Sequence, residues 1–151
     1  MAMKMTGEVV LPADKARVWA ALNDAEVLKA SLPGCQSLEK SSDTEFKAVM
    51  KVKVGPVSAT FKGNVNLTEI DAPTSYKIVG EGEGGVAGFA KGAAAVHLSE
   101  AEGGATRLAY DVDAQIGGKL AQLGSRLIDG VAKKLADEFF ANFAKAVAEG
   151  T

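Results

Sequence analysis

The hydrophobic pattern of the chain changes its period near Lys119, and no other feature constrains the fold as strongly. Before this point, apolar and polar residues alternate, as they do in strands that bury one face. After it, apolar residues recur at about every fourth position from Leu123 to Val147, which indicates an amphipathic helix. An antiparallel sheet with one wet face needs a cover on the other face. We therefore expect an α+β fold in which one long helix, beginning near Lys119, covers the sheet.

The alternating segments predict most of that sheet. They span residues 4–11, 46–54, 57–68, 76–84, 89–99 and 106–116, although the phase of the segment 89–99 is unclear. Two short helices are expected after the first strand, over residues 14–22 and 24–30. This order of elements predicts a helix-grip (START-like) fold, in which a curved antiparallel sheet of about six to seven strands surrounds the long C-terminal helix.

Size and composition indicate one ordinary folded domain. The 151 residues are 47% hydrophobic and 24% charged, so we expect a single domain over residues 1–151. The net charge of −2 argues against a nucleic-acid partner. With one Cys and one His, the chain offers no internal disulfide and no metal site rich in these ligands. We expect neither a metal nor a cofactor.

No segment of the sequence looks able to target or cross a membrane. The longest run without polar or charged residues covers residues 84–90, whereas a spanning helix needs about 20 residues. A single Cys is compatible with a reducing compartment. These features predict a soluble, cytoplasmic protein with at most peripheral membrane contact.

Short stretches along nearly the whole chain are similar to one known family. They comprise residues 11–13, 18–24, 32–35, 54–57, 59–63, 88–92 and 110–128. The longest begins Tyr110-Asp111-Val112-Asp113 and continues into the expected helix. With these motifs the chain resembles the G-subunit family of carbon monoxide dehydrogenase, within the polyketide cyclase/START/pollen-allergen-like superfamily.

The resemblance implies a function as well as a fold. Members of this family look like accessory proteins of molybdenum hydroxylases. The resemblance further implies that such a protein helps to link the enzyme to the inner face of the cytoplasmic membrane and handles its quinone acceptor. The expected partners are molybdenum hydroxylase subunits and a quinone or other lipid-like molecule. Many relatives continue beyond the last helix, whereas this sequence stops at Thr151, so we expect weak membrane attachment.

Few side chains are candidates for catalysis. His97 is the only imidazole, and a solvent-facing position in its strand is the simplest interpretation. Cys35 follows a Pro-Gly turn, with no electropositive surroundings that would favour its thiolate. Asp111 and Asp113 fall on the polar face of their strand. We therefore expect no catalytic residue, no metal ligand and no enzymatic activity.

The glycines of the central strands point to a binding site instead. Gly80 and Gly82 fall on the strand face that the helix should cover. Either the helix packs closely on these glycines, or an apolar hollow remains, which would suit an apolar ligand. The residues expected to bind that ligand are Met50, Val52, Phe61, Val65, Tyr76, Gly80, Gly82, Phe89, Tyr110, Leu123, Leu127 and Val131.

Three functions remain open on the sequence alone. The leading hypothesis is a non-enzymatic accessory protein that binds an elongated, lipid-like ligand, for which the resemblance suggests a quinone. The second is an adaptor or assembly factor with a packed core and no ligand. The third is a small-molecule cyclase or hydrolase, which is disfavoured because the covered face lacks titratable groups.

Overall fold

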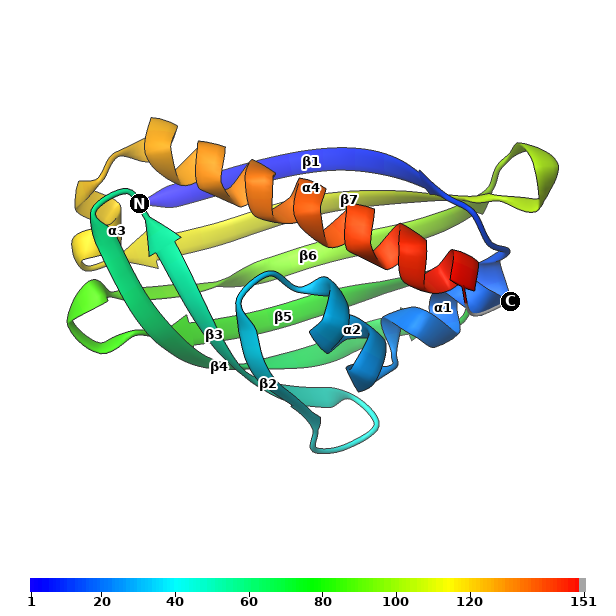
Figure 1. The fold of residues 1–151 in the computed structure, drawn as a ribbon, viewed down its shortest axis with the longest axis horizontal. Helices are drawn as coiled ribbons and strands as arrows, with labels where there is room; N and C mark the ends of the chain where they lie inside the picture. The colour runs from blue at the N-terminus through cyan, green and yellow to red at the C-terminus, as the bar shows by residue number, and fades with distance from the viewer. Residues whose placement is uncertain (150–151) are drawn as a thin grey trace.

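A computed structural model describes residues 1–149 as an α+β fold built on one strongly curved antiparallel sheet (Figure 1). The sheet has 7 strands in the order β1-β7-β6-β5-β4-β3-β2. The strands are β1 (Ala2–Leu11), β2 (Cys35–Lys40), β3 (Glu45–Val54), β4 (Val57–Asp71), β5 (Ser75–Glu83), β6 (Phe89–Glu100) and β7 (Thr106–Gly117). The fold class expected from the sequence is confirmed.

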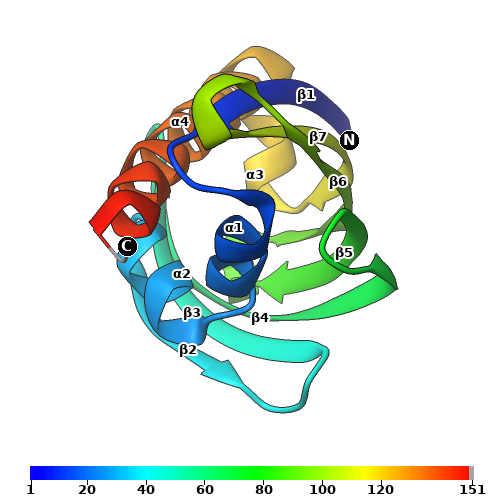
Figure 2. The ribbon, with the colours of Figure 1, turned by 90° about the vertical axis from the view of Figure 1, so that its right-hand side faces the viewer.

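Four α-helices and two short 3-10 turns complete the fold. The helices are α1 (Lys15–Leu22), α2 (Ala25–Ser31), α3 (Lys119–Gln122) and α4 (Ser125–Glu149), and the turns are η1 (Gly85–Ala87) and η2 (Glu102–Gly104). The sheet curves around α1, and α4 lies across its open side (Figure 2). The contacts of α4 accordingly involve β1 and β3, which lie near opposite edges of the sheet, and α2.

The two short helices begin one residue later than the sequence suggested, because an aspartate caps each of them. The Asp14 carboxylate accepts a hydrogen bond from the Arg17 backbone N–H at 2.8 Å. The Asp24 carboxylate accepts one from the Glu26 backbone N–H at 3.0 Å. Such caps satisfy N–H groups that the first turn of a helix leaves without partners. Both aspartates therefore lie outside the helices that they start.

The prediction of one unbroken C-terminal helix is wrong at its beginning. The segment forms the single turn α3, and the 25-residue helix α4 starts only at Ser125. Gly124, expected inside the helix, has φ 91° and lies at the break. This left-handed conformation costs a glycine little, so the chain can turn here. The turn lets Leu120 of α3 pack at one end of the sheet while α4 runs across it.

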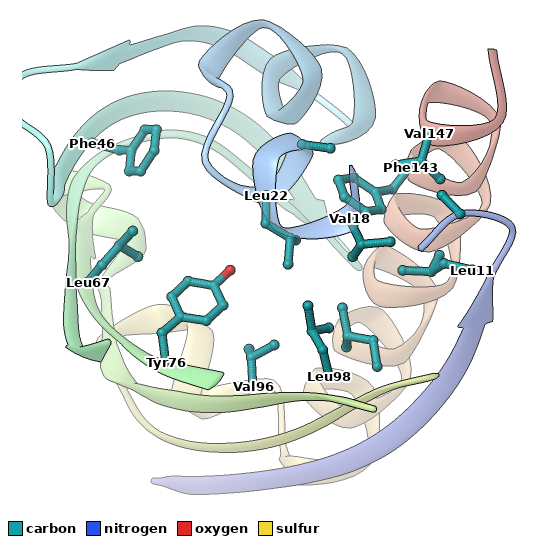
Figure 3. Packing of buried hydrophobic residues seen from close by; sticks show 13 residues of the cluster. Leu11, Val18, Leu22, Phe46, Leu67, Tyr76, Val96, Leu98, Phe143 and Val147 are labelled. Carbon is teal, nitrogen blue, oxygen red and sulfur yellow. The ribbon is translucent and has the colours of Figure 1, made fainter. Parts of the chain in front are cut away.

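The buried side chains form two clusters at opposite ends of the molecule. The larger lies where α1, α2 and the end of α4 meet the sheet (Figure 3). Its members Leu11, Phe143 and Val147 are each 0% exposed. The smaller cluster, near α3, consists of Val54, Ile116, Leu120 and Ile128. Between the two clusters, inner-facing side chains of the central strands remain partly exposed.

Candidate ligand-binding site

The inner face of the sheet is built from small residues between the two clusters. Strand pairing places Val65 of β4, Gly80 of β5, Gly92 of β6 and Ala114 of β7 in one row across the sheet. The neighbouring row contains Ala48, Gly63, Gly82 and Ala90. In a packed core, facing side chains would fill the space above such rows. The two rows form the floor of the candidate site, which we call the glycine floor.

A hollow of about 370 Å³ lies over the glycine floor. This volume falls within the range of small-molecule sites, which is about 300–1,000 Å³. Six of the predicted binding residues line it, namely Met50, Val52, Phe61, Val65, Gly80 and Gly82. Apolar lining residues that the prediction missed are Ala48, Ile78, Ala90, Ala93, Ala94, Val112 and Ala114. Asn64, Glu81 and Lys91 also border the hollow, from strand positions that line the outer face as well.

The glycines of the floor are there for two different reasons. A Cβ built on Gly82 would meet nothing closer than the Lys62 carbonyl oxygen at 3.9 Å, so the space above this residue is open. A Cβ on Gly92 would approach the Ala114 Cβ to 2.9 Å, which real side chains do not tolerate. Gly63 is equally confined, by the backbone of β5. Close strand contact therefore explains Gly63 and Gly92, whereas an open hollow explains Gly82.

The three predicted helix residues lie outside the lining of the hollow. Leu123 and Val131 pack against the smaller cluster. Leu127 is 36% exposed and lies against Gly55 in the turn between β3 and β4. All three pack near the end of the sheet beside α3, because the break at Gly124 directs this part of the chain there. The strands alone line the hollow.

Phe89 also lies away from the hollow. Pairing of β5 with β6 sets Gly80 opposite Gly92, which turns Ala90, Gly92 and Ala94 inward. Phe89 therefore points to the outer face, where it is 43% exposed. The sequence left this phase unclear because β6 is rich in Gly and Ala and shows no clear alternation.

The two predicted tyrosines have different surroundings. Tyr76 is only 5% exposed, and its ring packs edge-on against Trp19 of α1 at 5.1 Å between centroids. Tyr110 lies over Gly7 of the neighbouring strand β1 and stacks on Phe140 of α4 at 5.4 Å. Neither residue belongs to the lining of the hollow. Tyr76 nevertheless occupies the inner-facing position of β5 next to Ile78, which does line it.

The candidate catalytic residues are not gathered at this site. His97 is exposed on the outer side of β6. The Cys35 thiol donates to the Ser37 carbonyl oxygen at 3.3 Å, and burial raises its pKa, which disfavours the reactive thiolate. Asp111 and Asp113 are exposed on β7. Within residues 1–149, no group of three or more His, Cys, Asp or Glu side chains is placed to hold a metal ion.

A wider hollow of about 990 Å³ lies on the opposite, outer face of the sheet. Charged residues of both signs line it, among them Lys4, Lys77, Glu81, Lys91 and Asp111. Binding sites for small molecules are usually concave and mostly apolar. We therefore regard the smaller, apolar hollow over the glycine floor as the better candidate.

The fold and this site define an α+β helix-grip protein with an apolar hollow inside the grip. The family model CoxG, which describes the G subunit of carbon monoxide dehydrogenase, matches residues 7–148, and the chain belongs to this family. No curated protein matched the chain. Within residues 1–149, no helix is long and apolar enough to cross a membrane.

Solved structures share the fold of this chain. A conserved protein from Geobacillus kaustophilus is 31% identical, with 97% of this chain and 96% of that chain covered and a TM-score of 0.91. A START superfamily protein from Mycobacterium smegmatis is 12% identical over 98% and 99% of the two chains, with a TM-score of 0.73. Zhui aromatase/cyclase from Streptomyces sp. R1128 is 10% identical over 98% and 94%, with a TM-score of 0.71. The last two likenesses show the shared fold alone.

Proposed function

We propose that this protein is a non-enzymatic accessory protein that binds an elongated apolar ligand over the glycine floor. The observation that carries the proposal is the open, apolar space above Gly82, bounded by a packed cluster at each end. The apolar side chains that line this space are partly exposed to water, which is unfavourable. An apolar ligand would remove that surface from water.

A quinone is our first candidate for the ligand. The lining is apolar, which suits an isoprenoid chain or an aromatic ring better than a charged metabolite. The CoxG family name links such proteins to carbon monoxide dehydrogenase. We therefore propose a molybdenum hydroxylase of this type as the partner, with the protein holding the quinone that accepts its electrons.

An acid–base enzyme is less compatible with the hollow. The inner-facing positions that line it carry Gly, Ala, Val, Ile, Met and Phe side chains, without a carboxylate, imidazole or amine. General acid–base catalysis needs such a group within hydrogen-bond reach of the substrate. The shared fold with an aromatase/cyclase does not supply one.

Native mass spectrometry of the purified protein, followed by extraction and identification of any bound lipid, tests the ligand proposal. We expect a co-purifying apolar molecule in a 1:1 complex, or uptake of one equivalent of an added quinone. A protein that carries nothing and takes up no apolar molecule would contradict the proposal. In that case a ligand-free adaptor or assembly factor would be the better interpretation.

We also propose that the link to the membrane is peripheral and is made together with the enzyme. The apolar side of α4 is committed to the core, since Phe143 and Val147 are fully buried. When the protein alone is centrifuged with vesicles of anionic lipid, little of it should therefore sediment with them. More of it should sediment when the hydroxylase is also present. Tight sedimentation without the enzyme would contradict this, and would direct attention to Val86, which is 84% exposed on η1.

A further inference from the structure

Tyr76 is a buried residue whose hydroxyl group has no partner in the described part of the chain. The residue is 5% exposed, and within residues 1–149 its oxygen takes part in no hydrogen bond. Figure 3 shows this oxygen pointing into the interior, on the side of Leu22 and Phe46. Among residues 1–149, Arg17 Nε is the only fully enclosed side-chain polar atom without a hydrogen-bond partner, so the Tyr76 oxygen is not sealed off by the protein. A hydroxyl that has no protein partner and can still be reached is free to pair with a ligand.

The position of Tyr76 connects this hydroxyl with the hollow. On β5, Tyr76 precedes Ile78 and then Gly80 on the inner face. Ile78 lines the hollow and pairs with Ala94, whereas Tyr76 pairs with Val96 of the larger cluster. The Tyr76 side chain therefore stands where the glycine floor meets the larger cluster. It marks the end of the hollow that is nearer to α1.

The ring of Tyr76 is held in a fixed orientation. Trp19 packs against it with an angle of 68° between the ring planes. Leu67 and Val96, its neighbours in the larger cluster, are also buried. Burial raises the pKa of the phenol, so the group remains a protonated donor at physiological pH. A fixed donor in apolar surroundings selects strongly for an acceptor, because water competes poorly there.

We infer that the Tyr76 hydroxyl donates a hydrogen bond to a carbonyl-type oxygen at the leading end of the ligand. This inference rests on the proposed function, namely that the hollow binds an apolar molecule. It adds a chemical class, since a quinone, ketone or ester can accept this bond and a plain hydrocarbon cannot. It also adds an orientation: the oxygen-bearing end points towards α1, and the apolar remainder lies over the glycine floor.

The experiment compares two ligands and two tyrosine variants. The ligands are a 1,4-naphthoquinone with a short prenyl chain and the naphthalene hydrocarbon with the same chain. The variants are Tyr76→Phe and Tyr110→Phe. Tyr110 is the matched control, because it stands in the same row of the sheet as Tyr76 but its hydroxyl lies over Gly7 of β1. Dissociation constants are measured by calorimetry for both ligands with the parent protein and with each variant.

We expect Tyr76→Phe to weaken quinone binding about three- to tenfold, the usual net value of one hydrogen bond. Binding of the hydrocarbon should stay the same or improve, and Tyr110→Phe should change neither ligand. The melting temperature of ligand-free Tyr76→Phe should not fall. Because Trp19 is the only tryptophan, quenching of its fluorescence by the quinone would report the expected orientation independently.

Different failures have different meanings. If Tyr76→Phe weakens both ligands equally, or changes neither, Tyr76 is a packing residue and the inference is wrong. If the parent protein binds both ligands equally well, the hollow is an apolar site without a polar anchor, and the proposed function survives. If the parent protein binds neither ligand, the proposed function itself fails.

Discussion

The inner face of this sheet has a packed region and a hollow region, although both follow the same strand alternation. Towards α1 and α2, the inner positions carry large side chains such as Leu98 and Leu108, which are each 1% exposed. At the centre, the corresponding positions of the same strands are Gly92 and Ala114. The backbone geometry is continuous through both regions. The size of the inward side chains therefore decides where the grip is filled and where it is empty.

The difference matters because the two regions perform separate tasks. The packed ends hold α4 across the open side of the sheet, through the larger cluster at its C-terminal part and the smaller one near its start. The span between them does not need to be filled for the fold to hold. A protein built in this way can keep an apolar hollow, and with it the capacity to take up a ligand.

The largest expected effect comes from removing residues 119–151, which contribute α3 and α4. Both clusters lose members, among them Phe143 and Leu120, so only α1 and α2 still cover the inner face and the rest of it becomes exposed to solvent. We expect the truncated chain to lose cooperative thermal unfolding, measured by circular dichroism. A sharp melting transition in the truncated chain would show that the sheet and the short helices fold without α4.

The next prediction compares the loss of stability when one inward side chain is truncated to alanine in each region. Phe143→Ala should destabilise the protein by about 3–5 kcal/mol, because Phe143 is 0% exposed in the packed region. Val112→Ala, in the lining of the hollow beside the glycine floor, should cost about 1 kcal/mol or less, because its side chain already borders a hollow. Urea unfolding of both variants measures the difference. Similar losses would mean that the two regions are equally well packed.

Much of this fold could be predicted from the sequence, because most strands expose one face to solvent and their apolar and polar residues therefore alternate clearly. The edge strand β2 was missed, since Cys35–Lys40 shows little alternation and its pairing with β3 shifts register between Cys35 and Ser37. The break at Gly124 was missed because apolar spacing continues through it at Leu120, Leu123 and Leu127. Only the backbone conformation of Gly124 reveals the turn.

The site was predicted in part for a related reason. Alternation identified the inward residues of β3, β4 and β5, including Met50, Phe61 and Gly82, all of which line the hollow. It left the phase of β6 unclear, because Ala occupies both faces of this strand, and Phe89, which faces outward, was included among the expected binding residues. The hydrophobic period also could not predict which part of the sheet each helix residue contacts. That contact depends on the path of α4 across the sheet, and the period of a helix gives no information about this path.

A smaller effect is expected at the glycine that strand contact confines. Gly92→Ala should destabilise the protein by about 1–3 kcal/mol, because the new Cβ would approach the Ala114 Cα to 2.7 Å and force two strands apart. Thermal or urea unfolding measures the loss. A neutral Gly92→Ala would mean that the strands adjust easily, and the distinction between confined and open glycines would disappear.

The smallest expected effect on stability is at Gly82, where the hollow is open. Gly82→Ala is the reference, since it adds a Cβ with little volume and absorbs any backbone effect of replacing glycine. The further step from alanine to leucine at this position, measured as Gly82→Leu against Gly82→Ala, adds apolar volume to open space. We expect this step to change the free energy of unfolding by less than about 1 kcal/mol, because burying the leucine offsets the entropy lost in ordering it.

The same step should abolish or strongly reduce uptake of the prenylated naphthoquinone, because the leucine side chain would occupy the space of the ligand. If the hollow binds the ligand, the step from alanine to leucine therefore lowers quinone binding without lowering the free energy of unfolding. If the helix side of the grip packs directly on Gly82, the leucine would overpack the core and cost about 1–3 kcal/mol. A loss of that size, together with a parent protein that takes up no quinone, would overturn the ligand proposal and favour the adaptor. A neutral step that leaves quinone binding intact would instead place the ligand elsewhere in the molecule.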